Sequence, residues 1–595
     1  MNKIIIPIVI VAVITIGIGA FFVFQKPAFP EPQPSIGKCG DGICDAKEKA
    51  NPNLCPQDCE KKQPASDAKP TTAIPTTTLA LTQEPQEGVS KDSPFGIFGL
   101  YEWKLDSPKV ASVSDINNYL KDIGIKWVQE MYFTKELNEI PEGVYIYSRV
   151  GREGGNKPPD TSEKYKEALR EIIKKYKGKI KYWEVSTEPN GFSPPMGWKG
   201  YPKEYAIFLK ETYTIIKSEC SDCRVVFGGL FGTGIGVSEN SESAKFLKAV
   251  LEAGAAHYFD VFEFKQHAAN ANDYQELKNR MEVFGKILAD YGIDIKKIPV
   301  FVETATHDGS PSLPRVKLLP QTEAQQAAGL LKYYVYGLKS GIDKIFWNLI
   351  IERHNFGGRS DSPFNFYGLV NNPDNDGKSH KKLAYYTYKK MVEVLEGSNW
   401  KNIQAIQESS GIYIYKFTKQ GTPIWVAWND SSVTRTITIS GITQNRVRTT
   451  EAVPKYESGK DVIDYAKAFQ TDTLVVTNGA VALTLGQRPV FVEAFTVTSV
   501  EDERENIPKE FLLYQNYPNP FNPTTTIRFS LPQRTYTTLK VFDVLGREVE
   551  ALVNGELNAG EHSVVFNAKD LPSGVYLYRL TTPTFSQTKL MEVIK

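Results

Sequence analysis

The chain of 595 residues is longer than one hydrophobic core usually serves, so the sequence predicts several domains, one of which can reach the size of a barrel. Lysine and arginine together number 70 against 69 for aspartate and glutamate, so no excess of positive charge favours nucleic acid as a partner. Aromatic residues make up 12% of the chain, which suits stacking on sugar rings as well as large packed cores.

An apolar segment opens the chain. Residues 4–24 carry no charge, lie between Lys3 and Lys26, and are long enough to cross a bilayer, so the mature protein is expected outside the cytoplasm. Two interpretations stay open for residues 1–26. They are an uncleaved membrane anchor or a signal peptide cleaved near Ala20, where the small-residue pattern is poor.

A short cysteine-rich module follows at residues 36–61. It is too small for a hydrophobic core of its own, so we expect cross-links to stabilise it. Its cysteines are Cys39, Cys44, Cys55 and Cys59. They fit two disulfides in an oxidising compartment, with zinc as the competing interpretation, and nearby acidic residues leave calcium open although their spacing is not that of an EF-hand. Residues 62–92, rich in Pro and Thr, are expected to be a linker.

From residue 93 to residue 400, apolar strand-like runs alternate with amphipathic helical stretches, which is typical of βα units around a parallel sheet. Eight runs can be counted, at 95–101, 125–131, 143–149, 180–186, 224–230, 259–265, 298–304 and 344–350. The weakest connection comes after the second run, where the sequence offers at most a short helix. This rhythm predicts an α/β fold, a (β/α)8 barrel, with its active site where the strands end.

Carboxylates near the predicted strand ends are the first candidates for chemistry. Glu188 follows the fourth strand and Glu303 lies near the end of the seventh, and these two strands lie on opposite sides of a barrel mouth. Glycoside hydrolysis needs such a pair: one carboxyl protonates the leaving oxygen, and the other attacks the anomeric carbon or activates water. Glu184 stays open as an alternative acid or as a buried structural carboxylate.

The sequence T-E-P-N at residues 187–190, together with Glu303 in V-E-T, resembles the catalytic positions of clan A, a superfamily of (β/α)8-barrel glycoside hydrolases. The resemblance covers residues 93–400. It implies Glu188 as general acid/base and Glu303 as nucleophile, with retention of configuration. Thr187 is a departure, because the superfamily usually carries Asn at that position to bind the sugar 2-hydroxyl.

The same resemblance implies binding roles by position. Trp347 would form the floor of the subsite for the reacting sugar, and His267 and Asn190 would hydrogen-bond sugar hydroxyls or a catalytic carboxylate. Thr187 can still donate a hydrogen bond, and Trp103 is a candidate for lining the cleft. Structural interpretations stay open for these residues, because a strand-end histidine is often a satisfied polar group and a tryptophan is often packed in a core.

Cys220 and Cys223 precede the fifth predicted strand. In an exported chain, their C-x-x-C spacing favours a local structural disulfide over a redox dithiol. The six histidines show no HExxH or paired metal-ligand spacing, so we expect no catalytic metal. No glycine-rich phosphate loop follows a strand, so we expect no nucleotide cofactor, and calcium in the cysteine-rich module is the one cofactor left open.

Two all-β regions complete the chain. Residues 401–500 consist of short alternating strands typical of an accessory β-sandwich. Residues 510–595 contain NYPNPFNPTTTIRF and LPSGVYLYRL, which closely resemble the type A sorting domain of the type IX secretion system. That resemblance implies passage across the outer membrane with the type IX machinery as a partner. Such a route needs a released N-terminus, which favours a signal peptide at residues 1–26.

The sequence therefore predicts a secreted or cell-surface retaining glycosidase, monomeric, that acts on a polysaccharide or oligosaccharide. The alternative is a non-catalytic carbohydrate-binding or adhesion protein that keeps the barrel, an interpretation motivated by Thr187. A protease has no support, since no Ser/His/Asp set falls at the strand ends. The sugar, the linkage and the choice between endo and exo action stay open.

Overall fold

The computed structural model describes residues 93–99, 104, 107, 109–130, 140–151, 162–191, 197–232, 236–267, 270–313, 316–377, 379–496, 508 and 510–594. The predictions for residues 1–26, for the cysteine-rich module, for the linker and for Trp103 lie outside these residues. Within them, no helix combines the length and the apolar character that a membrane span needs.

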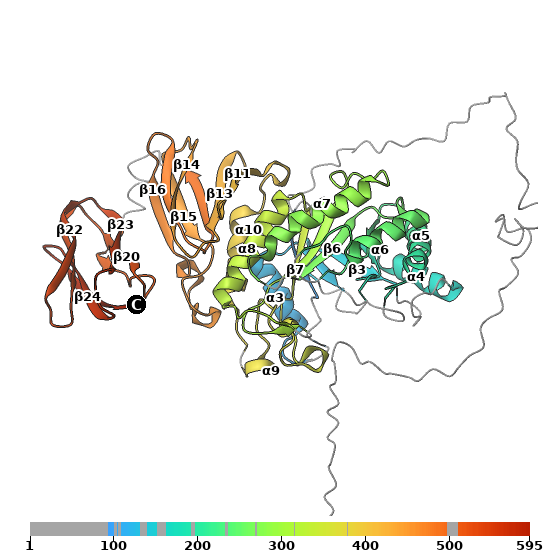
Figure 1. The fold of residues 1–595 in the computed structure, drawn as a ribbon, viewed down its shortest axis with the longest axis horizontal. Helices are drawn as coiled ribbons and strands as arrows, with labels where there is room; N and C mark the ends of the chain where they lie inside the picture. The colour runs from blue at the N-terminus through green and yellow to red at the C-terminus, as the bar shows by residue number, and fades with distance from the viewer. Residues whose placement is uncertain are drawn as a thin grey trace, which may run out of the picture. The chain divides into compact units, whose positions relative to one another are not determined.

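Eight parallel strands form the first sheet (Figure 1). They are β1 (Phe95–Phe98), β2 (Trp127–Glu130), β3 (Tyr145–Val150), β4 (Ile180–Val185), β5 (Arg224–Phe227), β6 (Phe262–His267), β7 (Val300–Ala305) and β10 (Lys344–Asn348). They pair in the order β5-β4-β3-β2-β1-β10-β7-β6. Isolated parallel bridges from Val226 to Val261 and from Leu230 to Phe264 join the two ends, so the sheet closes into the predicted barrel.

The barrel helices follow the amphipathic stripes of the sequence. They are α3 (Val113–Ile123), α4 (Glu163–Tyr176), α5 (Pro202–Glu219), α6 (Glu242–Val250), α7 (Glu276–Ala289), α8 (Glu323–Lys339) and α10 (Leu383–Leu395). Side-chain caps fix several starts, with capping boxes at Ser112 and Thr322 and a serine cap at Ser162. Shorter elements lie in the loops after β7 and β10, namely β8 (Ser312–Leu313), β9 (Val316–Lys317) and α9 (Pro373–Asp376).

Alternation along the strands divides the barrel core into two layers. One cluster fills the interior and includes Phe98, Trp127, Tyr147, Phe301 and Phe346. The intervening residues belong to a larger cluster that also contains the buried residues of the helices. The inward-facing apolar residues of a strand therefore show which polar residues also face inward. These are the polar residues an even number of positions away in the same strand.

Two β-sheets form the domain after the barrel. The larger one contains β11 (Gln404–Ser409), β12 (Ile412–Lys419), β13 (Thr422–Asn429), β15 (Arg446–Glu451), β16 (Thr471–Val475) and β18 (Val490–Phe495), and the smaller one pairs β14 (Arg435–Ser440) with β17 (Ala480–Leu485). Trp425 and Ala427 of β13 belong to the core between these sheets. Ile424, Val426 and Trp428 belong instead to the cluster of the barrel, so the larger sheet is covered on both faces.

The C-terminal domain is a second antiparallel sandwich with a core of its own. One sheet contains β19 (Leu512–Leu513), β20 (Thr524–Leu531) and β23 (Gly560–Asn567). The other contains β21 (Thr535–Phe542), β22 (Glu548–Leu557), β24 (Gly574–Thr581) and β25 (Ser586–Val593). The predicted fold class, a barrel followed by all-β sandwiches, is confirmed.

Candidate active site

The two predicted catalytic glutamates lie at the C-terminal ends of β4 and β7. Glu303 turns into the barrel, because Phe301, two residues earlier in the same strand, belongs to the interior cluster. Its side chain is 1% exposed. Glu188 lies in the turn after β4 in the left-handed region, with φ 48°, and its side chain is 14% exposed. Its N–H donates to the carbonyl of Gly229 at 3.1 Å, which ties this turn to the end of β5.

One lysine bridges the two glutamates. Lys265 Nζ forms an ion pair with Glu303 Oε2 and lies 3.9 Å from Glu188 Oε1. Lys265 comes from β6, is 2% exposed, and holds its ammonium 4.8 Å from the centre of the Phe98 ring. Since both carboxyl groups contact the same ammonium, the structure brings the predicted pair together at one point of the barrel mouth.

Glu303 receives two further hydrogen bonds, both at Oε1. His267 Nε2 donates at 2.9 Å and Asn348 Nδ2 donates at 2.5 Å. His267 is the last residue of β6, whereas the sequence places it just after the sixth strand, and its contact with Glu303 is one of the two that its predicted role allows. Three donors therefore surround one carboxylate.

These contacts separate the pKa values of the two glutamates. Burial by itself would raise the pKa of Glu303, but the charge of Lys265 and the hydrogen bond from His267 outweigh it and lower the pKa to about 2. Burial also raises the pKa of Glu188, where the more distant Lys265 and His267 oppose it less effectively. The two pKa values are thus moved in opposite directions, which is the division that acid and nucleophile roles need.

Two more carboxyl groups lie in the barrel core around Lys265. Glu184 accepts hydrogen bonds from Gly229 N–H at 3.1 Å and from Gln129 Nε2 at 3.2 Å, so each of its oxygens has a partner. Glu263 accepts a hydrogen bond from the Tyr147 hydroxyl, and burial raises its pKa well above the ordinary value. These contacts favour the structural interpretation of Glu184 over the alternative that it is the acid.

Thr187 and Asn190, on either side of Glu188 in the chain, have different surroundings. The side chain of Asn190 forms two hydrogen bonds with the backbone of Phe231. It donates to the carbonyl at 2.9 Å and accepts from the N–H at 2.8 Å. Its amide therefore holds the turn after β4 to the chain after β5. The Thr187 hydroxyl is buried and has no hydrogen-bond partner among the described residues. The sugar-binding roles of both residues stay predictions.

Trp347 lies in β10 and is fully buried, with Nε1 donating to the carbonyl of Tyr367 at 3.1 Å. It belongs to the cluster shared with the helices, because Phe346 and Asn348 take the inward positions of the strand. The residue of β10 that reaches Glu303 is Asn348. The stacking role of Trp347 stays a prediction.

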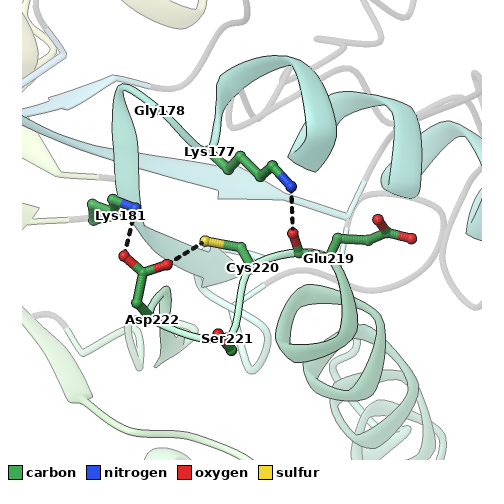
Figure 2. A pocket seen from close by; sticks show the side chains of 7 residues that line it. All are labelled: Lys177, Gly178, Lys181, Glu219, Cys220, Ser221 and Asp222. Carbon is green, nitrogen blue, oxygen red and sulfur yellow. Dashed lines mark hydrogen bonds and ion pairs between the residues drawn. The ribbon is translucent and has the colours of Figure 1, made fainter.

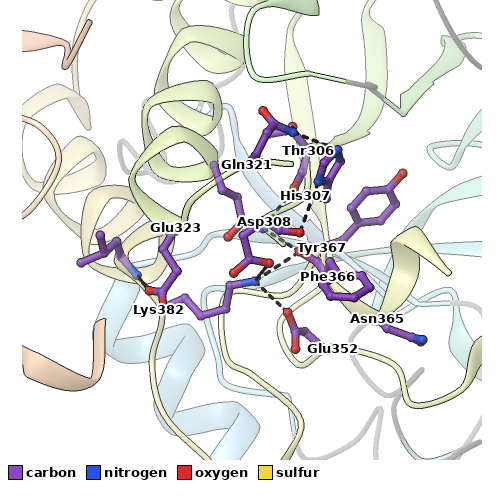
Figure 3. A network of polar contacts seen from close by, with 12 residues as sticks. Thr306, His307, Asp308, Gln321, Glu323, Glu352, Asn365, Phe366, Tyr367 and Lys382 are labelled. Carbon is purple, nitrogen blue, oxygen red and sulfur yellow. Dashed lines mark hydrogen bonds and ion pairs between the residues drawn. The ribbon is translucent and has the colours of Figure 1, made fainter. Parts of the chain in front are cut away.

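The chain after β10 supplies an aromatic wall beside His267. The rings of Phe364 and Tyr367 each lie 5.8 Å from the His267 ring. A buried ion network fixes this chain (Figure 3): Lys382 Nζ donates to Asp308 Oδ1 and to Glu352 Oε1, both at 2.7 Å. Lys382 also donates to the carbonyl of Phe366 at 3.2 Å, so the network is tied to the residue next to Tyr367.

A surface hollow of about 320 Å³ lies at the other end of the strands, next to the starts of β4 and β5 (Figure 2). Its lining includes Lys181, which forms an ion pair with Asp222 at 2.6 Å, and Cys220. Cys220 and Cys223 are joined by a disulfide, which confirms the prediction. The sulfur atoms of both cysteines and a carboxylate oxygen of Asp222 lie close enough together to be metal ligands. However, the disulfide removes the two thiolates that a metal would need.

Solved structures similar to the chain include several glycoside hydrolases. A family 39 glycoside hydrolase from the gut symbiont Bacteroides cellulosilyticus WH2 is 17% identical, with 69% of this chain and 83% of that chain covered and a TM-score of 0.49. A family 51 alpha-L-arabinofuranosidase from Bifidobacterium longum is 14% identical, with 68% and 97% covered and a TM-score of 0.46. A GH30 endoxylanase from Clostridium papyrosolvens C71 is 12% identical, with 67% and 96% covered and a TM-score of 0.43.

Family comparisons concern the two ends of the chain. No curated protein matches the sequence. Residues 24–81 match the family described as RET, Cysteine Rich Domain, and lie outside the described residues. Residues 515–594 match the family described as Secretion system C-terminal sorting domain. The chain thus ends in a secretion system sorting domain, as the resemblance of its sequence predicts.

Proposed function

We propose that this protein is an exported glycoside hydrolase that cleaves O-glycosidic bonds of a polysaccharide or oligosaccharide by retaining double displacement. One observation carries the proposal: Glu188 and Glu303 meet at a single ammonium at the mouth of a (β/α)8 barrel, with their pKa values moved in opposite directions. A carboxylic acid beside a carboxylate at this end of a barrel is what acid-assisted displacement at a sugar carbon requires.

In the first step, Glu303 attacks the anomeric carbon while Glu188 gives its proton to the leaving oxygen. Glu303 suits attack because the groups around it lower its pKa, and Glu188 suits proton donation because burial raises its pKa. In the second step, Glu188 takes a proton from water as the water oxygen replaces Glu303 at the same carbon. Two inversions at one carbon give retention.

Export is the second part of the proposal, and it rests on the sorting domain at residues 515–594. The type IX secretion machinery would be its partner, and the cell surface or the medium its destination. The disulfide between Cys220 and Cys223 fits this route, because such bonds persist in oxidising compartments.

The test is hydrolysis of a panel of aryl β-glycosides and polysaccharides by the full chain and by Glu188→Ala and Glu303→Ala variants. We expect both variants to lose at least about 10³-fold in kcat/KM. Azide should restore turnover in both. Glu188→Ala should give a glycosyl azide of retained configuration and Glu303→Ala one of inverted configuration, because azide replaces water in the first case and the nucleophile in the second.

Glu184→Gln is the matched control, since it removes a buried carboxylate from the same strand without touching the pair. It should keep most of the activity and show no azide effect. If Glu184→Gln instead behaves like the nucleophile or acid variants, the assignment of Glu188 is wrong. Binding of polysaccharide by the intact chain without turnover across the panel would favour a surface carbohydrate-binding protein.

A further inference from the structure

We propose that Lys265 is a positioning residue that changes its ion-pair partner during the reaction, from Glu303 in the resting enzyme to Glu188 in the glycosyl-enzyme. This inference rests on the proposed function and deepens it. According to this inference, the ammonium of Lys265 forms an ion pair with whichever of the two glutamates is ionised at each stage of the reaction.

The starting point is the asymmetry of the contacts. Lys265 Nζ is in direct contact with Glu303, while Glu188 Oε1 lies 3.9 Å away, at the limit of an ion pair. A rotation of the terminal methylene groups therefore suffices to move the ammonium from one carboxylate to the other. Because Lys265 is 2% exposed, water does not compete effectively for its charge.

The charges of the two half-reactions require such an exchange. During glycosylation the bond between the anomeric carbon and the leaving oxygen breaks, the proton of Glu188 goes to that oxygen, and a bond forms from Glu303 to the carbon. Glu303 then is a neutral ester and Glu188 a carboxylate. Hydrolysis reverses both changes, since water bonds to the carbon, the ester bond breaks and a water proton returns to Glu188. In each state one carboxylate needs one cation.

The surroundings of Lys265 guide the ammonium along this path. Its chain is confined by Gly229, where an added Cβ would come within 3.0 Å of Lys265 Cε, and by the Phe98 ring. The titratable groups that face it are Glu303 from β7, Glu184 and Glu188 from β4 and the turn after it, and Glu263 from β6 itself. His267, also from β6, contacts the other oxygen of Glu303. Both oxygens of Glu184 and one oxygen of Glu263 already have hydrogen-bond donors, whereas Lys265 is the one lysine or arginine in contact with the catalytic pair among the described residues.

The test compares Lys265→Met, which removes the charge, with Lys265→Arg, which keeps it, in the full chain. The matched control is Lys332→Met, because Lys332 is an equally buried lysine whose Nζ donates to Asp430 at 2.8 Å and to Asn272 at 2.9 Å. The probe is the 2,4-dinitrophenyl glycoside that the panel identifies, whose good leaving group makes hydrolysis of the glycosyl-enzyme limit kcat.

Two pH profiles then report the two partners separately. The acid limb of kcat/KM reports Glu303 in the free enzyme, and the acid limb of kcat reports Glu188 in the glycosyl-enzyme. In Lys265→Met we expect both limbs to move to higher pH, by about one to three units, because a cation next to a carboxylate has an effect of that size. Lys265→Arg should restore most of both shifts, and Lys332→Met should leave both limbs in place.

A shift in the kcat/KM limb alone would overturn the exchange, because Lys265 would then serve Glu303 only. The absence of any shift would overturn it as well. A carbon-13 titration of glutamate-labelled protein, with the Glu303 signal assigned by its loss in Glu303→Gln, measures the free-enzyme contact without turnover. If no glycoside is hydrolysed but Lys265→Met still raises the pKa of Glu303, the proposed function fails while the ion pair stands.

Discussion

At the scale of single residues, Glu188 and Glu303 differ in their neighbours and not in their chemistry. Glu303 has one ammonium and two hydrogen-bond donors on its oxygens, whereas Glu188 meets the same ammonium only at 3.9 Å. The difference is enough to reverse the effect of burial on one pKa and to leave it in force on the other. Three donors from two strands therefore lower the pKa of Glu303 and leave that of Glu188 raised, which is the basis for proposing Glu188 as the acid.

The effect of burial on a carboxyl pKa can also be tested at Glu352, through the pH dependence of the unfolding free energy. Burial raises its pKa to about 7, with Asp308 acting in the same direction and Lys382 opposing both. The folded protein therefore holds the Glu352 proton more tightly than the unfolded chain does. This contribution to stability is fully present below about pH 4.5 and is lost as the pH rises through about 7. Relative to Glu352→Gln, the wild type should lose up to about 3 kcal/mol of unfolding free energy between about pH 5 and pH 8.

The measurement is the unfolding free energy of both proteins from urea titrations across this pH range. Glu163→Gln, which makes the same change at an exposed position at the start of α4, is the control and should track the wild type. A constant difference between wild type and Glu352→Gln at all pH values would contradict the prediction.

The two glutamates could be identified from the sequence because both lie at strand ends. Once the strands are located, the carboxylates at their ends can be listed without knowing the register. It could also have revealed Lys265, since Glu263, Lys265 and His267 occupy alternate positions of one apolar run. Asn348 is different. Its inward direction depends on which residues of β10 face the interior, and the predicted run does not distinguish it from Trp347. A shift of one residue reverses the face, so site residues require the register that the structure supplies.

At the scale of elements, the close approach of β4 and β5 positions Glu188. The turn that holds Glu188 donates to the carbonyl of Gly229, and Asn190 clamps Phe231. Gly228 comes directly before Gly229, at a point where an added Cβ would come within 1.9 Å of the carbonyl oxygen of Ser186. Only glycine allows the two chains to lie this close.

Gly228→Ala should therefore push the turn after β4 away from β5. We expect a loss of about 2 kcal/mol in unfolding free energy, from overpacking, and a fall of at least about ten-fold in kcat/KM, because Glu188 is displaced. Gly178→Ala, in an open turn before β4 where an added Cβ meets nothing within 4 Å, is the control and should change neither quantity much. Full activity in Gly228→Ala would show that the strand contact does not position the acid.

Two strands of the accessory sandwich, β11 and β15, lack the alternating pattern by which the sequence predicts strands in residues 401–500. The strand β11 has five exposed residues out of six, and β15 has Arg446 and Arg448 on either side of Val447 and two threonines after them. Neither shows a continuous alternation of apolar and polar residues, so periodicity cannot identify them. Both pair with neighbours whose alternation is clear, β12 and β18, and tertiary pairing rather than local pattern forms them.

At the scale of the whole molecule, the barrel and the accessory sandwich share one hydrophobic cluster. One group of their polar contacts surrounds Glu323, at the start of α8. It accepts from Ser458 Oγ at 2.6 Å and from Gly459 N–H at 2.8 Å in the sandwich, and from Leu383 N–H at 2.8 Å in the barrel. A single carboxylate therefore links the sandwich to the residue beside Lys382.

Gly459→Ala tests this link. An added Cβ would come within 2.0 Å of the carbonyl oxygen of Lys381, so the sandwich and the start of α10 must separate. We expect a loss of about 2 kcal/mol in unfolding free energy and a measurable fall in kcat, because Lys382 moves with the backbone. Gly486→Ala, in the same sandwich with nothing within 4 Å of the added Cβ, should leave both unchanged. Equal values for the two variants would argue against a coupled junction.

The contacts of Glu323 also bear on engineering. Anyone who exchanges the sandwich for another module, in order to direct the barrel to a new surface, also removes the partners of Glu323 and uncovers the aromatic face of β13. The chimera would then inactivate at a lower temperature than either parent. The interface between the barrel and the new module would therefore have to be redesigned before the barrel is directed to a new surface.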